Sequence, residues 1–140
     1  MVNNKGENSQ VILFVIYELG IEQENRALDK EYIRLEVDIN CNFYAGAGEC
    51  FEEAFENLKK QFRKEYYLKN CFGCMFADYS VYGNSSFGTL YCFRNAKDQY
   101  LECASKDDYI KLWDIHTPLR VQEIDLCAQF IVRGDSIGYR

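Results

Sequence analysis

Residues 33–43, with the sequence IRLEVDINCNF, decide the fold of this chain. Apolar side chains occupy every odd position from Ile33 to Phe43, and polar side chains occupy every even position. A repeat of two residues places one face of a strand in a core and the other in water, as in an antiparallel sheet. The pattern therefore predicts a strand with one buried face, and it assigns Cys41 to that face as a core thiol.

The segments on either side predict a second strand, a turn and a helix. Residues 11–19 are rich in β-branched and aromatic side chains, which favours a buried strand. Residues 45–48, Ala-Gly-Ala-Gly, predict a turn. Residues 49–64 predict a longer amphipathic helix, because large apolar side chains recur there at the spacing of one helical face. These apolar side chains are Phe51, Phe55, Leu58 and Phe62.

Shorter elements are predicted for the second half of the chain. Residues 87–93 and 99–103 predict two strands joined by a hairpin loop. Ser105 and Asp108 have the spacing of a capping box, which predicts the start of a short helix. Residues 121–130 predict a last strand, with its even-numbered apolar side chains on one face.

Composition and charge bound the class of protein. The chain has 140 residues, 48% of them hydrophobic and 16% aromatic, which suits one domain with a real core. A net charge of -6 argues against a nucleic-acid partner or an anionic membrane surface, since both need excess Lys and Arg. Neither a secretory leader nor a membrane-spanning run is recognisable, so we expect a cytoplasmic protein. In a reducing compartment, seven cysteines are expected as thiols or metal ligands rather than disulfides.

The cysteine doublet in Asn70-Cys-Phe-Gly-Cys-Met75 is the strongest chemical signal in the sequence. Two thiols spaced as Cys71 and Cys74 can reach one tetrahedral Zn²⁺ ion from a tight turn, and Cys92 and Cys127 can complete a four-thiolate site. The alternative is two buried core thiols and a chance doublet. Cys50 and Cys103 are expected to be apolar filling. The single histidine, His116, is expected at the surface, and it is a substitute ligand only if Cys127 does not bind.

These elements predict an α+β fold in a single domain over residues 1–140. We expect an antiparallel β-sheet, one longer amphipathic helix, one short helix and a C-terminal half braced by zinc. Residues 1–9 are polar and are expected to be flexible.

Residues from about 70 to 140 resemble the C-terminal part of an uncharacterised bacterial family, known only as a domain of unknown function. The stretches that carry the resemblance are CFGCMFADYSVYGNSSFG, LYCFRNAKDQYL, SKDD, VQEIDLC and the terminal GYR. The resemblance implies that Cys71, Cys74, Cys92 and Cys127 are the four pattern cysteines of the family. Val81 stands where the family has a proline, and Ala128-Gln129 replaces Pro-Glu. The resemblance implies no known reaction.

The sequence favours a role without catalysis. It contains no His-Glu-x-x-His, no deaminase motif and no Walker loop. We therefore predict a non-catalytic protein with structural zinc that acts through protein–protein interaction. Its most concrete form is a bacterial immunity protein that neutralises a basic toxin, because an acidic protein can cover a basic face. The alternatives are a thiol-redox or zinc-dependent enzyme, and a structural or regulatory zinc protein with another partner.

Two surfaces are candidates for contact with a protein partner. One is acidic, with Glu52, Glu53 and Glu56 on the predicted helix. The other is aromatic and lies in the turn-rich loop predicted at residues 78–88. Its side chains are Tyr79, Tyr82 and Phe87. The same side chains are also explained by simpler roles, as a solvated helix face and as packing around the metal turn.

Overall fold

A computed structural model describes residues 1–25, 28–82 and 90–133, in a mixed α+β fold with antiparallel sheets. The chain forms two compact units, Met1–Tyr67 (unit 1) and Leu68–Arg140 (unit 2), and each is described by itself. The single domain expected from the sequence stays a prediction. In the part of the chain that the structure describes, no helix has the length and apolar character that crossing a membrane requires.

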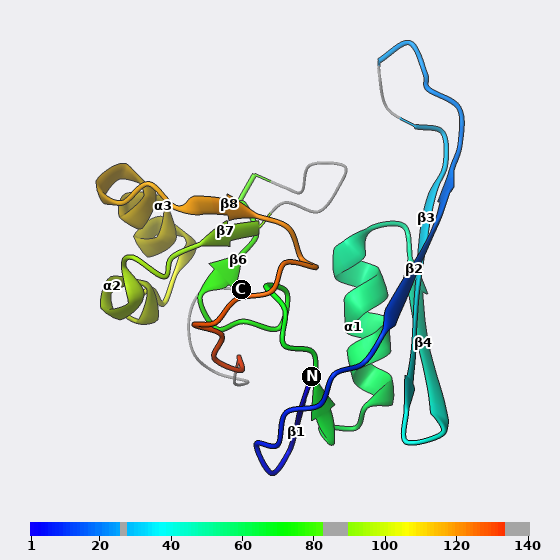
Figure 1. The fold of residues 1–140 in the computed structure, drawn as a ribbon. Coiled ribbons are helices and arrows are strands. Elements are labelled where there is room, and N and C mark those ends of the chain that lie inside the picture. The colour runs from blue at the N-terminus through cyan, green and yellow to red at the C-terminus, as the bar shows by residue number, and fades with distance from the viewer. Residues whose placement is uncertain (26–27, 83–89, 134–140) are drawn as a thin grey trace. The chain divides into compact units, whose positions relative to one another are not determined.

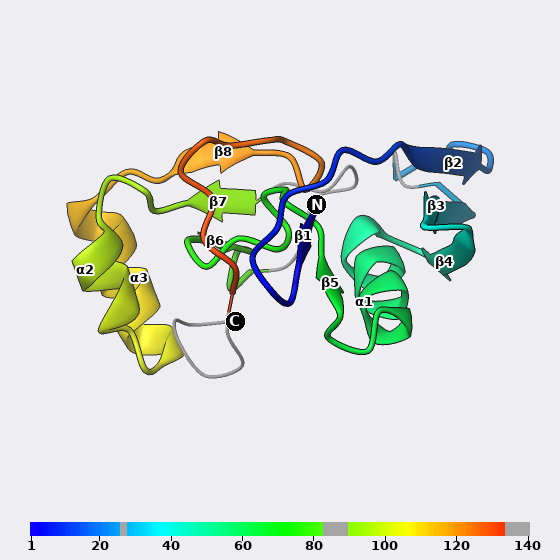
Figure 2. The ribbon, with the colours of Figure 1, turned by 60° about the horizontal axis from the view of Figure 1, so that its bottom comes forward.

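Unit 1 is built on a three-stranded antiparallel sheet with the order β2-β3-β4. Its strands are β2 (Leu13–Leu19), β3 (Glu31–Ile39) and β4 (Asn42–Gly48). The alternation predicted from Ile33 to Ile39 is confirmed, since all four odd-numbered side chains of this segment are buried. One helix, α1 (Phe51–Gln61), packs against β3 and β4 on a single face of the sheet (Figures 1 and 2).

The predicted strand is too long, because the chain reverses at residues 40–41. Asn40 and Cys41 have φ angles of 51° and 64°, in the left-handed region that a two-residue hairpin turn requires. The Ile39–Asn42 pair closes this turn. Cys41 and Phe43 are consequently exposed, so the prediction of Cys41 as a core thiol is wrong.

The predicted turn at residues 45–48 is also wrong, because these residues belong to β4. Their small side chains let α1 approach the sheet. A Cβ atom added to Gly46 would lie 2.2 Å from the Leu58 backbone nitrogen and 2.4 Å from the Ala54 carbonyl oxygen. The glycine therefore serves helix packing rather than chain reversal.

The predicted helix is confirmed with shorter bounds. Its apolar face buries Phe51, Ala54, Phe55 and Leu58. Glu52 and Glu53 occupy the first turn, while Lys59 and Lys60 occupy the last, an order that complements the helix dipole. At the N-terminus, where the sequence predicts flexibility, β1 (Val2–Asn3) pairs with β5 (Tyr66–Tyr67).

In its described residues, unit 2 combines a small antiparallel sheet with two short helices. The sheet has the order β6-β7-β8, and its strands are β6 (Ala77–Asp78), β7 (Leu90–Cys92) and β8 (Leu119–Val121). The helices are α2 (Lys97–Leu101) and α3 (Lys106–Ile115). Its core is aromatic: the Phe93 ring stacks on Tyr100 with centroids 5.1 Å apart and meets Tyr109 edge-on at 5.2 Å.

Two strands predicted for this half are wrong and one helix start is confirmed. Residues 99–103 fall largely in α2 instead of a strand. The strand predicted at 121–130 ends at Val121, and Ile124 and Leu126 are exposed. Ser105 is the N-cap of α3, because its Oγ accepts a hydrogen bond from the Asp108 N–H at 3.2 Å. Residues 83–88 of the predicted loop lie outside the described residues.

Candidate metal centre

The Cys71–Cys74 loop is a tight turn closed by its own hydrogen bonds. Asn70 is buried, and its Oδ1 accepts a hydrogen bond from the Gly73 N–H at 3.1 Å. The Cys74 N–H donates to the Cys71 carbonyl at 3.2 Å. A side chain at position 73 would collide with the preceding chain, since a Cβ there would lie 2.6 Å from the Leu68 carbonyl oxygen. The asparagine and the glycine of the motif therefore shape the turn.

The C-terminal segment of unit 2 holds this turn in place. The Cys71 N–H donates to the Asp125 carbonyl at 2.9 Å, and the Arg133 N–H donates to the Gly73 carbonyl at 3.0 Å. The Arg133 guanidinium adds a bond from Nε to the Cys74 carbonyl at 3.3 Å. Segments far apart in the sequence thus fix the backbone of the doublet.

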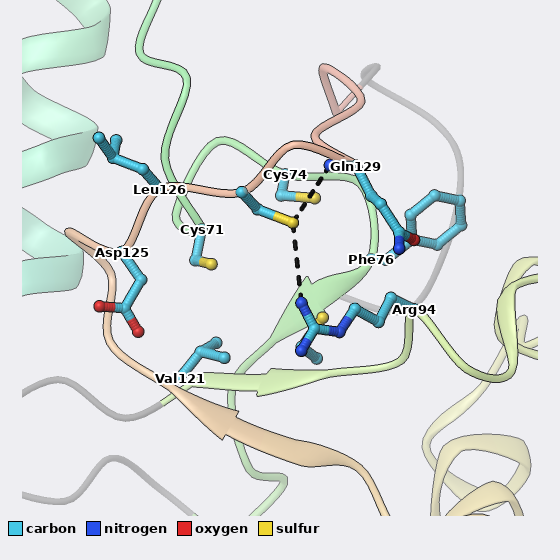
Figure 3. A pocket seen from close by; sticks show the side chains of 10 residues that line it. Cys71, Cys74, Phe76, Arg94, Val121, Asp125, Leu126 and Gln129 are labelled. Carbon is cyan, nitrogen blue, oxygen red and sulfur yellow. Dashed lines mark hydrogen bonds between the residues drawn. The ribbon is translucent and has the colours of Figure 1, made fainter.

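Four thiols from three separate segments line one cavity of about 220 Å³ in unit 2. Cys71 and Cys74 come from the turn, Cys92 is the last residue of β7, and Cys127 follows β8 in an irregular segment. Figure 3 shows Cys71, Cys74 and Arg94 directed toward the same space. The cysteines that do not line this cavity are Cys41, Cys50 and Cys103. The structure thus gathers the four cysteines that the sequence selects.

The four thiols share the cavity without converging on one point. Across residues 1–25, 28–82 and 90–133, no group of three or more His, Cys, Asp or Glu side chains is arranged to hold a metal ion. Zinc ligation by these cysteines therefore stays a prediction.

Burial and the neighbouring cysteines raise the pKa of two of these thiols, Cys71 and Cys92. The pKa of Cys71 is raised to about 12, mainly by burial and then by the neighbouring Cys92 and Cys74, whose thiolates would repel a third. Burial also raises the pKa of Cys92, against a lowering contribution from a hydrogen bond donated by the Arg94 backbone. A bound dication would reverse this balance, since it stabilises each thiolate directly.

Arg94 and Gln129 are site residues that the sequence analysis missed. The Cys127 sulfur accepts a hydrogen bond from the Gln129 N–H at 3.3 Å and from Arg94 Nη1 at 3.9 Å, the two contacts drawn in Figure 3. Arg94 therefore contacts both single cysteines, Cys92 through its backbone and Cys127 through its side chain. Its position two residues after Cys92 is the one signal in the sequence that points to it.

Two features of the cavity disfavour a reactive thiol. A reactive thiol needs a lowered pKa and access to solvent, whereas Cys71 and Cys74 are buried and the pKa of Cys71 is raised. Among the described residues that line the cavity, Asp125 is the single carboxylate and no histidine is present. A general base beside the four sulfur atoms is thus limited to one carboxylate.

The residues predicted to contact a partner fall in different environments. Glu53 is exposed on α1, while Glu52 and Glu56 are half-buried; Glu56 pairs with Lys59 at 3.4 Å. Tyr82 is 81% exposed. Tyr79 is only 7% exposed and its hydroxyl donates to Glu123 at 2.7 Å, so its prediction as a contact residue gives way to a packing role. Phe87 lies outside the described residues.

The fold defines a class of protein with two units: a two-layer α/β unit, followed along the chain by a small cysteine-rich unit. The chain belongs to a family of unknown function (DUF6304), whose model matches residues 1–77, slightly more than half of the chain. The match covers unit 1 and the Cys71–Cys74 doublet, and it ends before Cys92. It shows an uncharacterised family, but it gives no support to the resemblance of residues 78–140. No curated protein and no solved structure matches the chain.

Proposed function

We propose that this protein binds one structural Zn²⁺ ion through Cys71, Cys74, Cys92 and Cys127 and acts without catalysis, through contact with another protein. The observation that carries the proposal is the shared cavity of these four thiols. Four thiolates are the ligand set of a closed structural zinc site, in which no coordination position is open to a substrate.

Zinc binding has to draw the four sulfur atoms together, because they do not form a ready-made ligand group in the described residues. Binding is therefore coupled to the packing of the segment that carries Cys127 against the Cys71–Cys74 turn. In such coupled sites the free energy of metal binding becomes free energy of folding. Bound zinc would cross-link the segment that carries Cys127 to the Cys71–Cys74 turn. The backbone hydrogen bonds of the turn hold the turn in position.

Metal content of single-cysteine variants tests the site. Replacing any of the four cavity cysteines by serine is expected to abolish stoichiometric zinc, measured by native mass spectrometry. The matched controls are the replacements of the three other cysteines, Cys41→Ser, Cys50→Ser and Cys103→Ser, which should each retain one zinc per chain. Chelation of the unmodified protein should unmask four thiols. A wild-type chain that binds no zinc after refolding with the metal rules the proposal out.

The partner we propose is a basic protein, most concretely a toxin that this chain neutralises as an immunity protein. The support is electrostatic: unit 1 has thirteen acidic and eight basic side chains, so it carries five of the six net negative charges of the chain. An acidic face speeds association with a basic partner and disfavours binding of acidic proteins.

Charge reversal separates a specific acidic surface from general acidity. Reversing Glu52, Glu53 and Glu56 to lysine should slow association with a basic toxin encoded beside this chain's gene. Reversing the exposed acidic residues of unit 2, Asp98, Glu102 and Asp114, gives a variant of equal net charge that should associate normally. Equal effects of the two variants would remove α1 as the contact surface. Co-expression that fails to protect cells from that toxin contradicts the immunity role.

A further inference from the structure

An apolar stripe runs along strand β2 of unit 1 and begins at the residue before the strand. Residues 11–17, VILFVIY, contain no charged side chain. Ile12, Phe14 and Ile16 are 71%, 56% and 46% exposed, on the face of the sheet opposite to α1. Solvated sheet faces normally carry polar side chains, as β3 does at its outward positions Arg34 and Glu36. A row of three large exposed apolar side chains indicates a surface that something covers.

Strand β2 also lies at an edge of its sheet. Among the described residues, β2 borders only β3 and forms the edge of the sheet. The Gly20 N–H donates to the Lys30 carbonyl at 2.8 Å, so the even-numbered residues of β2 direct their hydrogen-bonding groups toward β3. The two-residue hairpin agrees with this assignment. Its closing pair, Ile39 and Asn42, implies that odd-numbered residues of β3 bond to β4 and even-numbered residues bond to β2. Leu13 and Val15 therefore direct their N–H and C=O groups outward.

The opposite edge of the sheet, strand β4, is covered at one outward carbonyl by a side chain of α1. On β4, the Ala47 carbonyl accepts a hydrogen bond from the Asn57 side chain of α1 at 2.8 Å. Natural edge strands are usually blocked by proline, by lysine or by a bulge. The segment 11–17 has neither of those residues, and β2 pairs with β3 in register without a bulge.

We propose that β2 pairs with β2 of a second copy of this chain, antiparallel and centred on Phe14. In this register Leu13 lies opposite Val15 of the second copy, so the outward backbone groups of both residues meet. Ile12 lies opposite Ile16 and Phe14 opposite Phe14. Every pair is apolar, and the two three-stranded sheets join into one continuous antiparallel sheet.

A second copy fits this edge better than the basic partner proposed for the acidic surface. The sequence of residues 11–17 is self-complementary about Phe14, which is the condition for a two-fold interface. The segment offers no carboxylate to a basic chain. The two-fold axis stands perpendicular to the sheet, so both α1 helices lie on one face and both apolar stripes lie side by side on the other. The inference is independent of the metal site and of the proposed immunity role.

Sedimentation velocity of zinc-supplemented full-length protein over a range of concentrations tests the proposal. The wild type should sediment as a dimer. Phe14→Lys places two like charges directly opposite each other and should weaken dimerisation by at least about tenfold. Phe43→Lys is the matched control, because Phe43 is also 56% exposed on the same face but lies on β4. This control should stay dimeric.

A mixture of Phe14→Lys with Phe14→Glu supplies the decisive outcome. The two variants should each be monomeric alone and should form a heterodimer when mixed, because lysine then faces glutamate across the axis. Circular dichroism of each variant establishes that the fold is kept. A wild type that is monomeric at every concentration overturns the proposal. So does a dimer that Phe43→Lys disrupts as strongly as Phe14→Lys, since that result places the contact across the sheet face.

Discussion

Unit 1 and unit 2 are stabilised in different ways. In unit 1 the strands of the main sheet have seven to nine residues and pair along most of their length. In unit 2 the strands have two or three residues. Within the described ranges, all three buried polar or charged side chains belong to unit 2: Asn70, Asp78 and Glu123. Unit 1 is specified by a repeated apolar pattern, whereas unit 2 depends on individual contacts.

The contacts around Asp78 illustrate this dependence. Its buried carboxylate accepts hydrogen bonds from the Tyr100 hydroxyl at 2.8 Å and from the Tyr79 N–H at 2.9 Å. The Arg133 guanidinium donates to the same Tyr100 oxygen at 2.7 Å. Burial raises the pKa of Tyr100, which keeps its hydroxyl as a donor. Since Arg133 also holds the Cys71–Cys74 turn, the buried network and the candidate metal centre support each other.

Removal of zinc is expected to have the largest effect and to separate the two units. Structural zinc contributes on the order of 10 kcal/mol of binding free energy that is coupled to folding. A strong chelator should therefore abolish amide hydrogen-exchange protection in β7, α2 and α3, while β3 and α1 keep theirs. Exchange followed by mass spectrometry measures both units in one sample. Equal protection with and without chelator would contradict the proposed brace.

Truncation of a core side chain in unit 1 should destabilise unit 1 and spare unit 2. Phe55 is fully buried on α1 and stacks on Phe51 with ring centroids 5.9 Å apart. Phe55→Ala should lower the free energy of unfolding of unit 1 by about 3–5 kcal/mol, measured by urea denaturation with zinc present. Phe43→Ala, at an exposed position, should change it by less than about 0.5 kcal/mol. Similar losses for the two variants would show that the core is misassigned.

Replacing Arg94 should change the affinity for zinc and leave the stability of both hydrophobic cores unchanged. Its guanidinium contacts the Cys127 sulfur, and such outer contacts typically change metal affinity by about 10–100-fold. Arg94→Gln should weaken zinc affinity within that range, measured by competition with a chromophoric chelator. Lys97→Gln removes a nearby positive charge that does not line the cavity and should leave the affinity unchanged. Equal affinities for all three proteins would remove Arg94 from the site.

The smallest effect on stability is expected at the N-terminus of α3. There a helix cap within the local sequence, rather than a contact between distant residues, stabilises unit 2. Ser105→Ala removes the N-cap and should cost about 1 kcal/mol. The Ser105 hydroxyl donates to the Asp108 carboxylate at 2.6 Å and lowers the pKa of that carboxyl below 3.8. The lowered pKa stabilises the folded state above pH 3.8, and this contribution is lost as the pH falls through the folded-state pKa. NMR titration of Asp108 should show its pKa rising in the variant. An unchanged pKa would contradict the bond.

The sequence predicts structure well where a pattern repeats and poorly where one contact decides. The alternation from Ile33 to Ile39 is visible because every second side chain meets the same core. The hairpin at Asn40 and Cys41 is missed because Cys41 is an unusual residue for a positive φ. Gly46 resembles a turn residue, and only the approach of α1 explains it.

The same limit applies to the candidate site. The spacing of Cys71 and Cys74 is a local signal of half a zinc site. Cys92 and Cys127 have no such spacing, and only the family resemblance assigns them as the other two pattern cysteines. Residues 121–130 alternate like a strand, but their backbone bonds instead hold the doublet, as between the Asp125 carbonyl and the Cys71 N–H. Arg94 carries no recognisable motif, so its contact with Cys127 is visible only in the folded chain.

X-ray absorption at the zinc edge tests the central claim most directly, because it measures the ligands of the metal in the intact protein. We expect one zinc per chain, surrounded by four sulfur atoms at about 2.3 Å. A shell of nitrogen and oxygen atoms, or protein that takes up no zinc, would contradict it.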